Sequence, residues 1–272
     1  PQRNSITLRS DFQAVHVNEA RFYLIRDRDR VHIFLGEKRV GSTKVLDKNH
    51  IPRVMFICAV SRPDPAPDFD GKIGIWCVCV TKQAQRISAR REWGKQYEFD
   101  VTLDAEWYQE WCKDSFLPAL KEKMPWLEGE EVVTQQDEAT PNTGKDTPRK
   151  LNELGRDGGW NVNLVTQPAQ SPVLNINDLV FFASLKTRVW RERYDIIDGL
   201  VQGIKSMYDA HDAPALERVW QSLFKQYNQV LKALGGNDFE VQHTETKKRQ
   251  CAGSLPKSVK IDREAFNAAV EW

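Results

Sequence analysis

The sequence lacks a long hydrophobic run, a secretory leader pattern and an excess of charge of either sign. No apolar stretch approaches the roughly 20 residues that span a bilayer, and residues 1–5 do not resemble the hydrophobic segment of a signal peptide. The formal net charge is +1, which excludes a surface that is basic throughout but leaves room for a local basic face. We therefore expect a nuclear or cytoplasmic protein without a membrane-spanning segment.

Cysteine is also scarce. The five cysteines form an odd set without a repeated spacing, which predicts neither a disulfide framework nor a zinc module and favours a reducing compartment. In an alternating strand Cys77 and Cys79 point to one face, so we expect them to pack in the core, with metal ligation as the alternative. Internal repeats and low-complexity tracts are absent too. A length of 272 residues with 40% hydrophobic content therefore indicates one large domain, or one domain with an appendage.

The first half reads as extended structure, because β-branched and aromatic residues cluster in short runs between turn residues. The runs that predict strands are Ala14 to Ile25, Val31 to Leu35, Arg53 to Val60 and Lys72 to Val80. Between the last two, residues 62–71 contain three prolines and end in Asp70-Gly71, which predicts a long irregular connection.

The second half alternates helix and strand. Asp104 can cap a helix that continues to Met124 with a kink at Pro118, and residues 131–135, 148–155 and 161–165 follow as strand, helix and strand. Helix dominates from Asn177. An apolar stripe that favours core packing over a partner surface then runs through Leu216, Val219, Trp220, Leu223, Phe224, Tyr227, Leu231 and Leu234. Gly235-Gly236 ends this helix, and the segment around Lys247-Lys248-Arg249 reads as a basic tail.

This element order predicts an α/β, RNase H-like fold, in which a mixed five-stranded sheet carries helices on both faces. We expect residues 1–193 to form that core and residues 194–272 to form a helical C-terminal extension with the tail. Three places put an acid, or its amide, at the end of an element: Asn18 in Val17-Asn18-Glu19, Asp137 in Gln136-Asp137-Glu138, and Asp178 in Asn177-Asp178-Leu179.

These blocks resemble those of mariner-like transposases of the DDE superfamily, especially the plant and oomycete branch. That branch has an Asp-Glu-Lys-Trp-Phe-Tyr strand, a Gln-Gln-Asp-Asn-Ala-Arg-Pro-His block and a Ser-Pro-Asp-Leu-Asn-x-x-Asp-Leu block, which supply three metal-binding aspartates. Residues 50–56, 69–74 and 179–185 are also similar to that branch, and 40 residues separate Asp137 from Asp178, close to its spacing. The resemblance covers most of the chain up to about residue 190.

The resemblance implies DNA cleavage and strand transfer with two Mg²⁺ or Mn²⁺ ions. The first acid is expected to bridge both ions, and the other two acids are expected to complete their coordination shells. Asn18 keeps the size of aspartate but loses its charge, and Glu19 points to the opposite face of the strand. We therefore expect Asp137 and Asp178 to remain as metal ligands, metal binding to be weak or lost, and catalysis to be impaired. Further departures from the family blocks are Ala20, Arg21, Glu138, Thr140, Asn142 and Val173.

Several hypotheses stay open. One aspartate-to-asparagine change could be an engineered inactivation, whereas departures around all three blocks favour natural drift, a domesticated transposon and a pseudoenzyme. The domain could also be an active transposase core, or a repurposed, effector-like nuclear module that binds DNA or protein. No helix-turn-helix module precedes the first strand, so we expect DNA binding without sequence preference, and a homodimer is an option. A basic cluster interleaved with Trp93 is either a phosphate-binding surface or a solvated loop: Lys82, Arg86, Arg90, Arg91 and Lys95.

Overall fold

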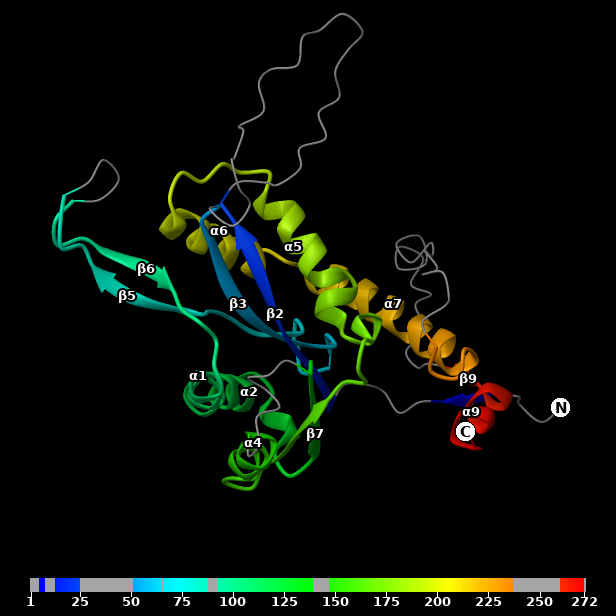
Figure 1. Cartoon of the computed structure of the whole chain (residues 1–272). Helices are drawn as coiled ribbons and strands as arrows, with labels where there is room; N and C mark the ends of the chain where they lie inside the picture. Colours follow the sequence, from blue (N-terminus) through cyan, green and yellow to red (C-terminus); the bar gives the residue numbers. More distant parts are fainter. Residues whose placement is uncertain are drawn as a thin grey trace, which may run out of the picture.

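A five-stranded mixed sheet forms the centre of the protein. The computed structural model describes residues 5–7, 13–24, 51–64, 66–87, 92–138, 147–236 and 260–271 (Figure 1). The strand order is β4-β3-β2-β7-β8. The first three strands pair antiparallel, and β2, β7 and β8 pair parallel. Their bounds are β2 (Ala14–Tyr23), β3 (Arg53–Ser61), β4 (Lys72–Cys77), β7 (Glu131–Gln136) and β8 (Asn161–Thr166). The predicted mixed sheet is confirmed.

Helices cover both faces of this sheet, as predicted (Figure 1). On one face lie α1 (Ala105–Trp111), the π-helical turn η3 (Cys112–Phe116), α2 (Leu117–Lys123), the 3₁₀ turn η4 (Pro125–Leu127) and α4 (Thr147–Gly155). On the other face lie the 3₁₀ turn η5 (Pro172–Leu174), the π-helical turn η6 (Asn177–Phe181), α5 (Phe182–Val189), α6 (Ile197–Asp209) and α7 (Ala213–Lys232).

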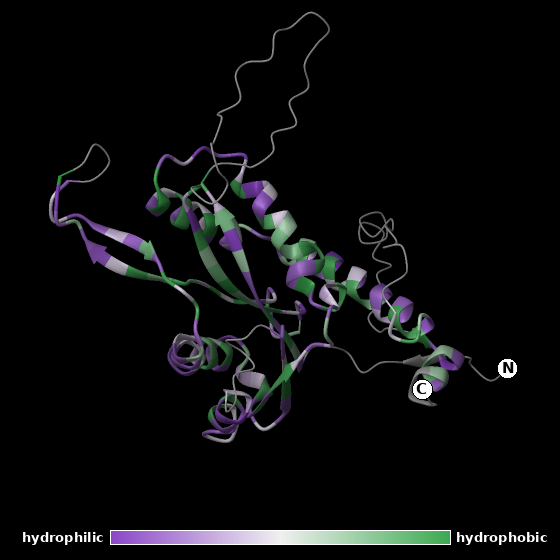
Figure 2. Ribbon diagram, viewed as in Figure 1, coloured by the Kyte–Doolittle hydropathy of each residue, from purple (hydrophilic) through white to green (hydrophobic). Residues whose placement is uncertain are grey.

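Strand β2 shows how the sequence builds the two cores. Val15 and Val17 belong to the buried cluster on the α1–α2 side, whereas Ala20 and Phe22 belong to the cluster on the α5–α7 side. The strand is therefore buried on both faces, which stabilises the fold by about 1.5–3 kcal/mol for each fully buried large apolar side chain. In Figure 2 the neighbouring strand β3 is mostly hydrophobic, while the helices alternate hydrophobic and hydrophilic segments.

The α1–α2 region follows the sequence prediction with one refinement. The Asp104 carboxylate accepts a hydrogen bond from the Trp107 backbone N–H at 2.9 Å, which caps α1. The predicted kink near Pro118 takes the form of the π turn η3, in which the Leu117 N–H reaches back to the Cys112 carbonyl. Proline lacks the N–H that a regular helix needs, so an irregular turn at this point costs little.

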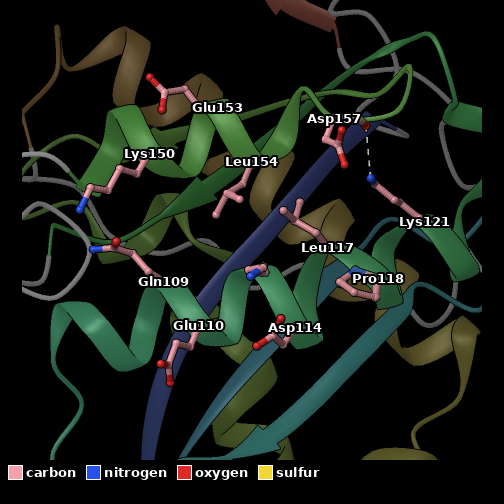
Figure 3. Close-up of a pocket in the computed structure, with 11 residues that line it drawn as sticks. Gln109, Glu110, Asp114, Leu117, Pro118, Lys121, Lys150, Glu153, Leu154 and Asp157 are labelled. Atoms are coloured by element: carbon pink, nitrogen blue, oxygen red, sulfur yellow. Dashed lines mark hydrogen bonds between the residues drawn. The ribbon is translucent and has the colours of Figure 1, made fainter.

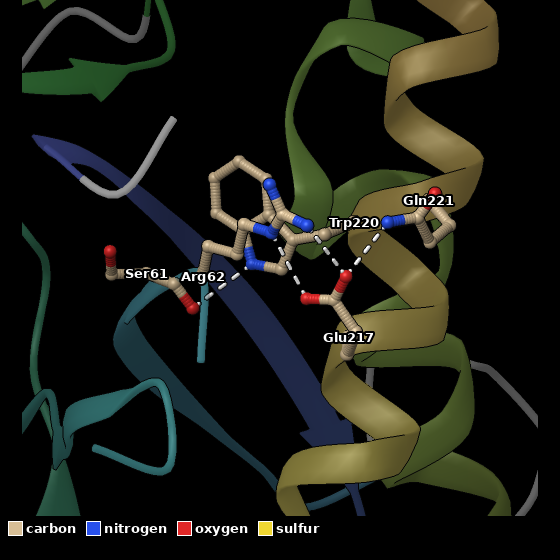
Figure 4. Close-up of polar contacts among 5 residues, drawn as sticks. All are labelled: Ser61, Arg62, Glu217, Trp220 and Gln221. Atoms are coloured by element: carbon tan, nitrogen blue, oxygen red, sulfur yellow. Dashed lines mark hydrogen bonds and ion pairs between the residues drawn. The ribbon is translucent and has the colours of Figure 1, made fainter. Parts of the chain in front are cut away.

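Helix α7 is held on the sheet by a buried polar cluster (Figure 4). The Arg62 guanidinium, just after β3, lies 2.8 Å from Glu217 Oε1, and its side chain is only 4% exposed. The Trp220 indole N–H donates to the Ser61 carbonyl at 3.0 Å, and the same ring makes an edge contact with His16. The predicted apolar stripe of α7 is therefore a core face for most of its length, although Leu234, beyond the end of the helix, is 40% exposed.

The predicted strand 72–80 is interrupted at Val78, so the prediction of one continuous strand is wrong. The Val78 N–H donates to the Met55 carbonyl, and the chain then leaves the sheet as β5 (Cys79–Gln83), which pairs with β6 (Gln96–Asp100). The resulting hairpin projects from the body of the protein (Figure 1). Nothing in the apolar pattern of β4 and β5 marks the break, and β6 was not predicted.

The odd cysteine set predicted no disulfide framework, and a single pair, Cys77 with Cys79, is bridged in the structure. In a continuous strand these two residues would stand further apart. The interruption at Val78 brings their Cα atoms to 5.3 Å, within the range that a disulfide spans. Cys77 packs against the core as expected, and the other described cysteines, Cys58 and Cys112, are buried and free.

The first and last described segments pair with each other. Strand β1 (Ser5–Thr7) lies antiparallel to β9 (Lys260–Asp262), and α9 (Arg263–Glu271) follows, none of which was predicted. The predicted strand 31–35 and the basic tail at residues 247–249 fall outside the described residues. The division of the chain near residue 193 stays a prediction. Among the helices of the described ranges, none is long and apolar enough to cross a membrane.

Candidate active site

A hydrogen bond joins two of the three predicted site residues. Asn18, in the middle of β2, is 3% exposed, and its Nδ2 donates to Asp178 Oδ2 at 2.7 Å. Its Oδ1 accepts the Glu19 backbone N–H, also at 2.7 Å. A carboxylate can only accept and a backbone N–H can only donate, so these two partners fix which way the amide points.

The segment that carries Asp178 is fixed to β2 by three further hydrogen bonds. The side-chain amide of Asn175 donates to the Val17 carbonyl at 3.1 Å, and that of Asn177 donates to the His16 carbonyl at 3.0 Å. The Ile176 N–H donates to His16 Nδ1 at 3.1 Å, and burial lowers the pKa of His16 to about 3. A neutral imidazole that accepts at Nδ1 carries its proton on Nε2. Sequence reasoning missed these residues, although two asparagines beside Asp178 were a signal.

Asp137 follows directly on β7. His16 pairs with Gln135 in the parallel register, and continuing this register by two residues places Asn18 level with Asp137. The end of β7 is held by two glutamines: Gln136 Oε1 accepts from the buried Tyr108 hydroxyl at 2.8 Å, and Gln135 Nε2 donates to the Leu174 carbonyl at 2.9 Å.

Asp137 and Asp178 line one open groove of about 580 Å³ beside β2 and α5, whose other lining residues are Glu19, Ala20, Arg21, Tyr23, Met55, Phe182, Ala183 and Lys186. The structure therefore brings the three predicted site residues together, with Asn18 buried beneath the groove. Their catalytic and metal-binding roles stay predictions.

The charges in this groove influence one another. Asp178 as a residue is exposed, but its carboxyl group is partly enclosed, and this burial raises its pKa. The hydrogen bond from Asn18 lowers the pKa of Asp178, and the nearby Asp137 raises it further. Lys186, two helical turns further along, lies near enough to favour the charged carboxylate. Burial lowers the pKa of Lys186, and the attraction of Asp178 opposes that change. Sequence reasoning did not select Lys186.

The residues of this groove do not fit a pair of divalent ions bridged from β2. Mg²⁺ and Mn²⁺ require oxygen ligands, but Asn18 turns its N–H₂ group toward Asp178 and its oxygen toward a backbone N–H. Glu19 lines the groove from the other face of the strand, where its carboxylate adds to the raised pKa of the buried Cys112 thiol. No group of three or more histidine, cysteine or acidic side chains in the described part of the chain is arranged to hold a metal.

A larger groove of about 830 Å³ lies elsewhere, between α1–α2 and α4 (Figure 3). Its walls carry both lysines and acids, with Leu117 and Leu154 between them, and Lys121 Nζ donates to the Asp157 carbonyl at 3.3 Å. It contains none of the predicted site residues. The volume of a groove therefore does not identify the candidate active site in this protein, whereas the contact between Asn18 and Asp178 does.

The predicted basic cluster lies on the β5–β6 hairpin. Lys82 is on β5, and its ammonium lies 3.5 Å from the centre of the Phe99 ring on β6. Arg86 and Lys95 are exposed near the tip, and Arg90 and Arg91 fall outside the described residues.

Comparison with known proteins adds to this geometry. No family model and no curated protein sequence matches the chain. Among solved structures, the crystal structure of the catalytic domain of Mos1 mariner transposase matches with a TM-score of 0.54 and 15% identity, over 84% of this chain and 85% of that one. This is the fold of the Mos1 mariner transposase catalytic domain.

Two Mos1 complexes match as well. A pre-cleavage Mos1 transpososome gives a TM-score of 0.63 at 17% identity, and the Mos1 mariner paired end complex with Mn gives 0.61 at 18%. Each match covers 84% of this chain and 57% of the Mos1 chain, so the present chain spans little more than half of those transposases. The predicted mariner resemblance and RNase H-like fold are confirmed at the level of fold. The plant and oomycete branch stays a prediction.

Proposed function

We propose that this chain is a transposase-derived domain that binds DNA through phosphate contacts and whose metal-dependent strand cleavage is impaired. The observation that carries the proposal is the orientation of the Asn18 amide, whose N–H donates to Asp178 Oδ2 at 2.7 Å. Among the similar Mos1 structures, one is a paired-end complex with the left transposon end and another is a paired end complex with Mn. Those properties support, for this chain, a DNA partner and an ancestral divalent metal.

Divalent metals, when bound, would stabilise the attacking and leaving oxygens of a phosphoryl transfer. In this chain Asp137 and Asp178 supply two carboxylates on one groove, and Asn18 supplies a hydrogen-bond donor to one of them. This donor occupies a lone pair of Asp178 Oδ2 that a cation would otherwise use. We therefore propose that metal binding is weak or lost, and that the domain is a repurposed nuclear module or pseudoenzyme.

The test is a manganese titration by calorimetry together with a nicking assay on supplied DNA. The wild-type protein should bind metal weakly or not at all at millimolar concentration, and it should leave the DNA intact. Asn18→Asp should bind metal more tightly, although it need not cleave, since Glu138 and Val173 also depart from the family blocks. Manganese-dependent nicking by the wild-type protein that Asp137→Ala abolishes would refute the impairment.

An active core remains the second candidate, because Asp137 and Asp178 are both retained and share one groove. The same nicking assay decides between the two. Binding to two unrelated duplexes at two salt concentrations tests the DNA proposal: we expect weak binding that falls with salt and does not depend on sequence. The possible homodimer, which no observation on this single chain supports, is tested by sedimentation.

A further inference from the structure

The β5–β6 hairpin has two chemically different faces. Side chains alternate along each strand, and Val80 pairs with Phe99 while Lys82 pairs with Tyr97. The backbone bonds between Ala84 and Lys95 extend this register, so Lys95 falls on the same side. We name this the outer face and define it as Val80, Lys82, Lys95, Tyr97 and Phe99. It combines aromatic and aliphatic surface with two lysines.

The carboxylates lie on the opposite, inner face, which is tied to the protein body. Asp100 Oδ1 accepts the Met55 N–H at 3.2 Å, and the Glu98 backbone N–H donates to Asp198 Oδ1 of α6 at 3.0 Å. Within the described hairpin, Glu92 near the tip is the one acid that is not on the inner face. The inner face thus fixes the hairpin to the core, and the outer face is left with positive charge.

The outer face exposes rings that core packing does not use. Phe99 is 45% exposed and Trp93, beside the tip, is 71% exposed. The Lys82 ammonium lies over the Phe99 ring at 3.5 Å, so a positive charge and an aromatic surface occupy the same spot. A DNA phosphate that draws the Lys82 ammonium away would leave the Phe99 ring free to stack with the neighbouring base.

We propose that the outer face of the β5–β6 hairpin, together with Trp93, binds unpaired DNA by stacking bases on Phe99 and Trp93 while Lys82 and Lys95 contact phosphates. Unpaired DNA fits better than a duplex, because the faces of paired bases are already stacked. A ribbon that reads a groove needs polar side chains to reach base edges, and Val80 and Phe99 cannot supply them. The inference rests on the proposed DNA-binding function.

The experiment measures fluorescence anisotropy of a labelled oligothymidylate of roughly 20 nucleotides, longer than common site sizes, and of a duplex of equal length, both in EDTA. Phe99→Leu and Trp93→Leu keep an apolar side chain and remove the ring. Each should weaken oligothymidylate binding by about 5- to 150-fold, which corresponds to one stacked base, and leave duplex binding unchanged. Lys82→Gln should reduce the slope of log affinity against log salt by about 0.7.

The matched controls are Trp126→Leu, which removes an exposed ring on the turn η4, and Lys123→Gln, which removes an exposed lysine on α2. Both should bind oligothymidylate as the wild type does. Wild-type binding of the duplex alone, or an equal loss in the Trp126 control, would overturn the inference while leaving DNA binding intact. Conversion of a dimer to a monomer by Phe99→Leu, without loss of affinity, would also overturn it and assign this face to a second copy. Failure to bind either DNA would refute the proposed function itself.

Discussion

Replacing Asn18 by aspartate should make the stability of this fold depend on divalent metal. The substitution removes the hydrogen bond to Asp178, which costs about 1–3 kcal/mol. It also sets two carboxylates roughly 4 Å apart, where the repulsion is about 1 kcal/mol in water and about 4 kcal/mol at the effective dielectric of a protein surface. Because Asp178 is exposed, the lower part of that range applies, and we expect a total loss of about 2–4 kcal/mol.

The assay is urea unfolding near neutral pH, in EDTA and then in manganese. Asn18→Ala is the matched control, because it loses the hydrogen bond without adding a charge. In EDTA the aspartate variant should be less stable than the alanine variant, and manganese should rescue only the aspartate variant, by about 2.7 kcal/mol at 100 times the dissociation constant. Equal stability of Asn18→Asp and wild type in EDTA, or stabilisation of the wild type by manganese, would show that the amide does not have the role we assign to it.

Three further predictions concern the fold. Glu217→Ala removes the two hydrogen bonds that the buried Arg62 guanidinium donates to this carboxylate, and it should cost about 3 kcal/mol in chemical unfolding. Glu153→Ala breaks an exposed pair and should cost under about 0.5 kcal/mol, and equal costs would contradict the argument. Gly155→Ala would put its methyl group against the Val162 carbonyl oxygen of β8 and should lower the melting temperature. Gly199→Ala meets only ordinary contacts and should leave the melting temperature unchanged or raise it. A lower melting temperature for Gly199→Ala than for Gly155→Ala would refute this prediction. The pKa of about 3 means that His16 in the folded protein should stay neutral, when followed by NMR, down to about pH 4. Below about pH 6.5 the unfolded chain takes up a proton at His16, so the free energy of unfolding should fall by up to about 1.4 kcal/mol per pH unit. Titration of the folded His16 near pH 6.5 would exclude that contribution.

The sequence predicts the central sheet well because its signals are local. Strands β2, β3, β7 and β8 are short apolar runs bounded by turn residues, and the helix after Asp104 begins with a capping residue that the structure uses. The parts that sequence reasoning missed depend on distant partners. Strand β6 alternates polar and aromatic residues over only five positions, and its partner β5 lies beyond the unpredicted break at Val78. Residues 5–7 pair with residues 260–262.

The candidate site shows the same division. The three positions Asn18, Asp137 and Asp178 could be selected from their blocks, and the structure gathers them around one groove. The direction of the Asn18 amide could not be predicted, since it depends on the fold placing the Asp178 carboxylate beside its nitrogen and the Glu19 backbone N–H beside its oxygen. Sequence reasoning did not select Lys186, which lies two helical turns after Asp178 and near enough to favour the charged carboxylate.

The pairing of β1 with β9 also affects how the chain is made. Residues 5–7 are synthesised before the rest of the described chain, but their partner strand is complete only once residue 262 has been synthesised. At about 5–20 residues per second, that delay is roughly 13–50 s, which is much longer than a hairpin or a helix needs to form. Strand β1 must therefore remain without this partner while the central sheet assembles. Pairing of β1 with β9 is a late event in folding.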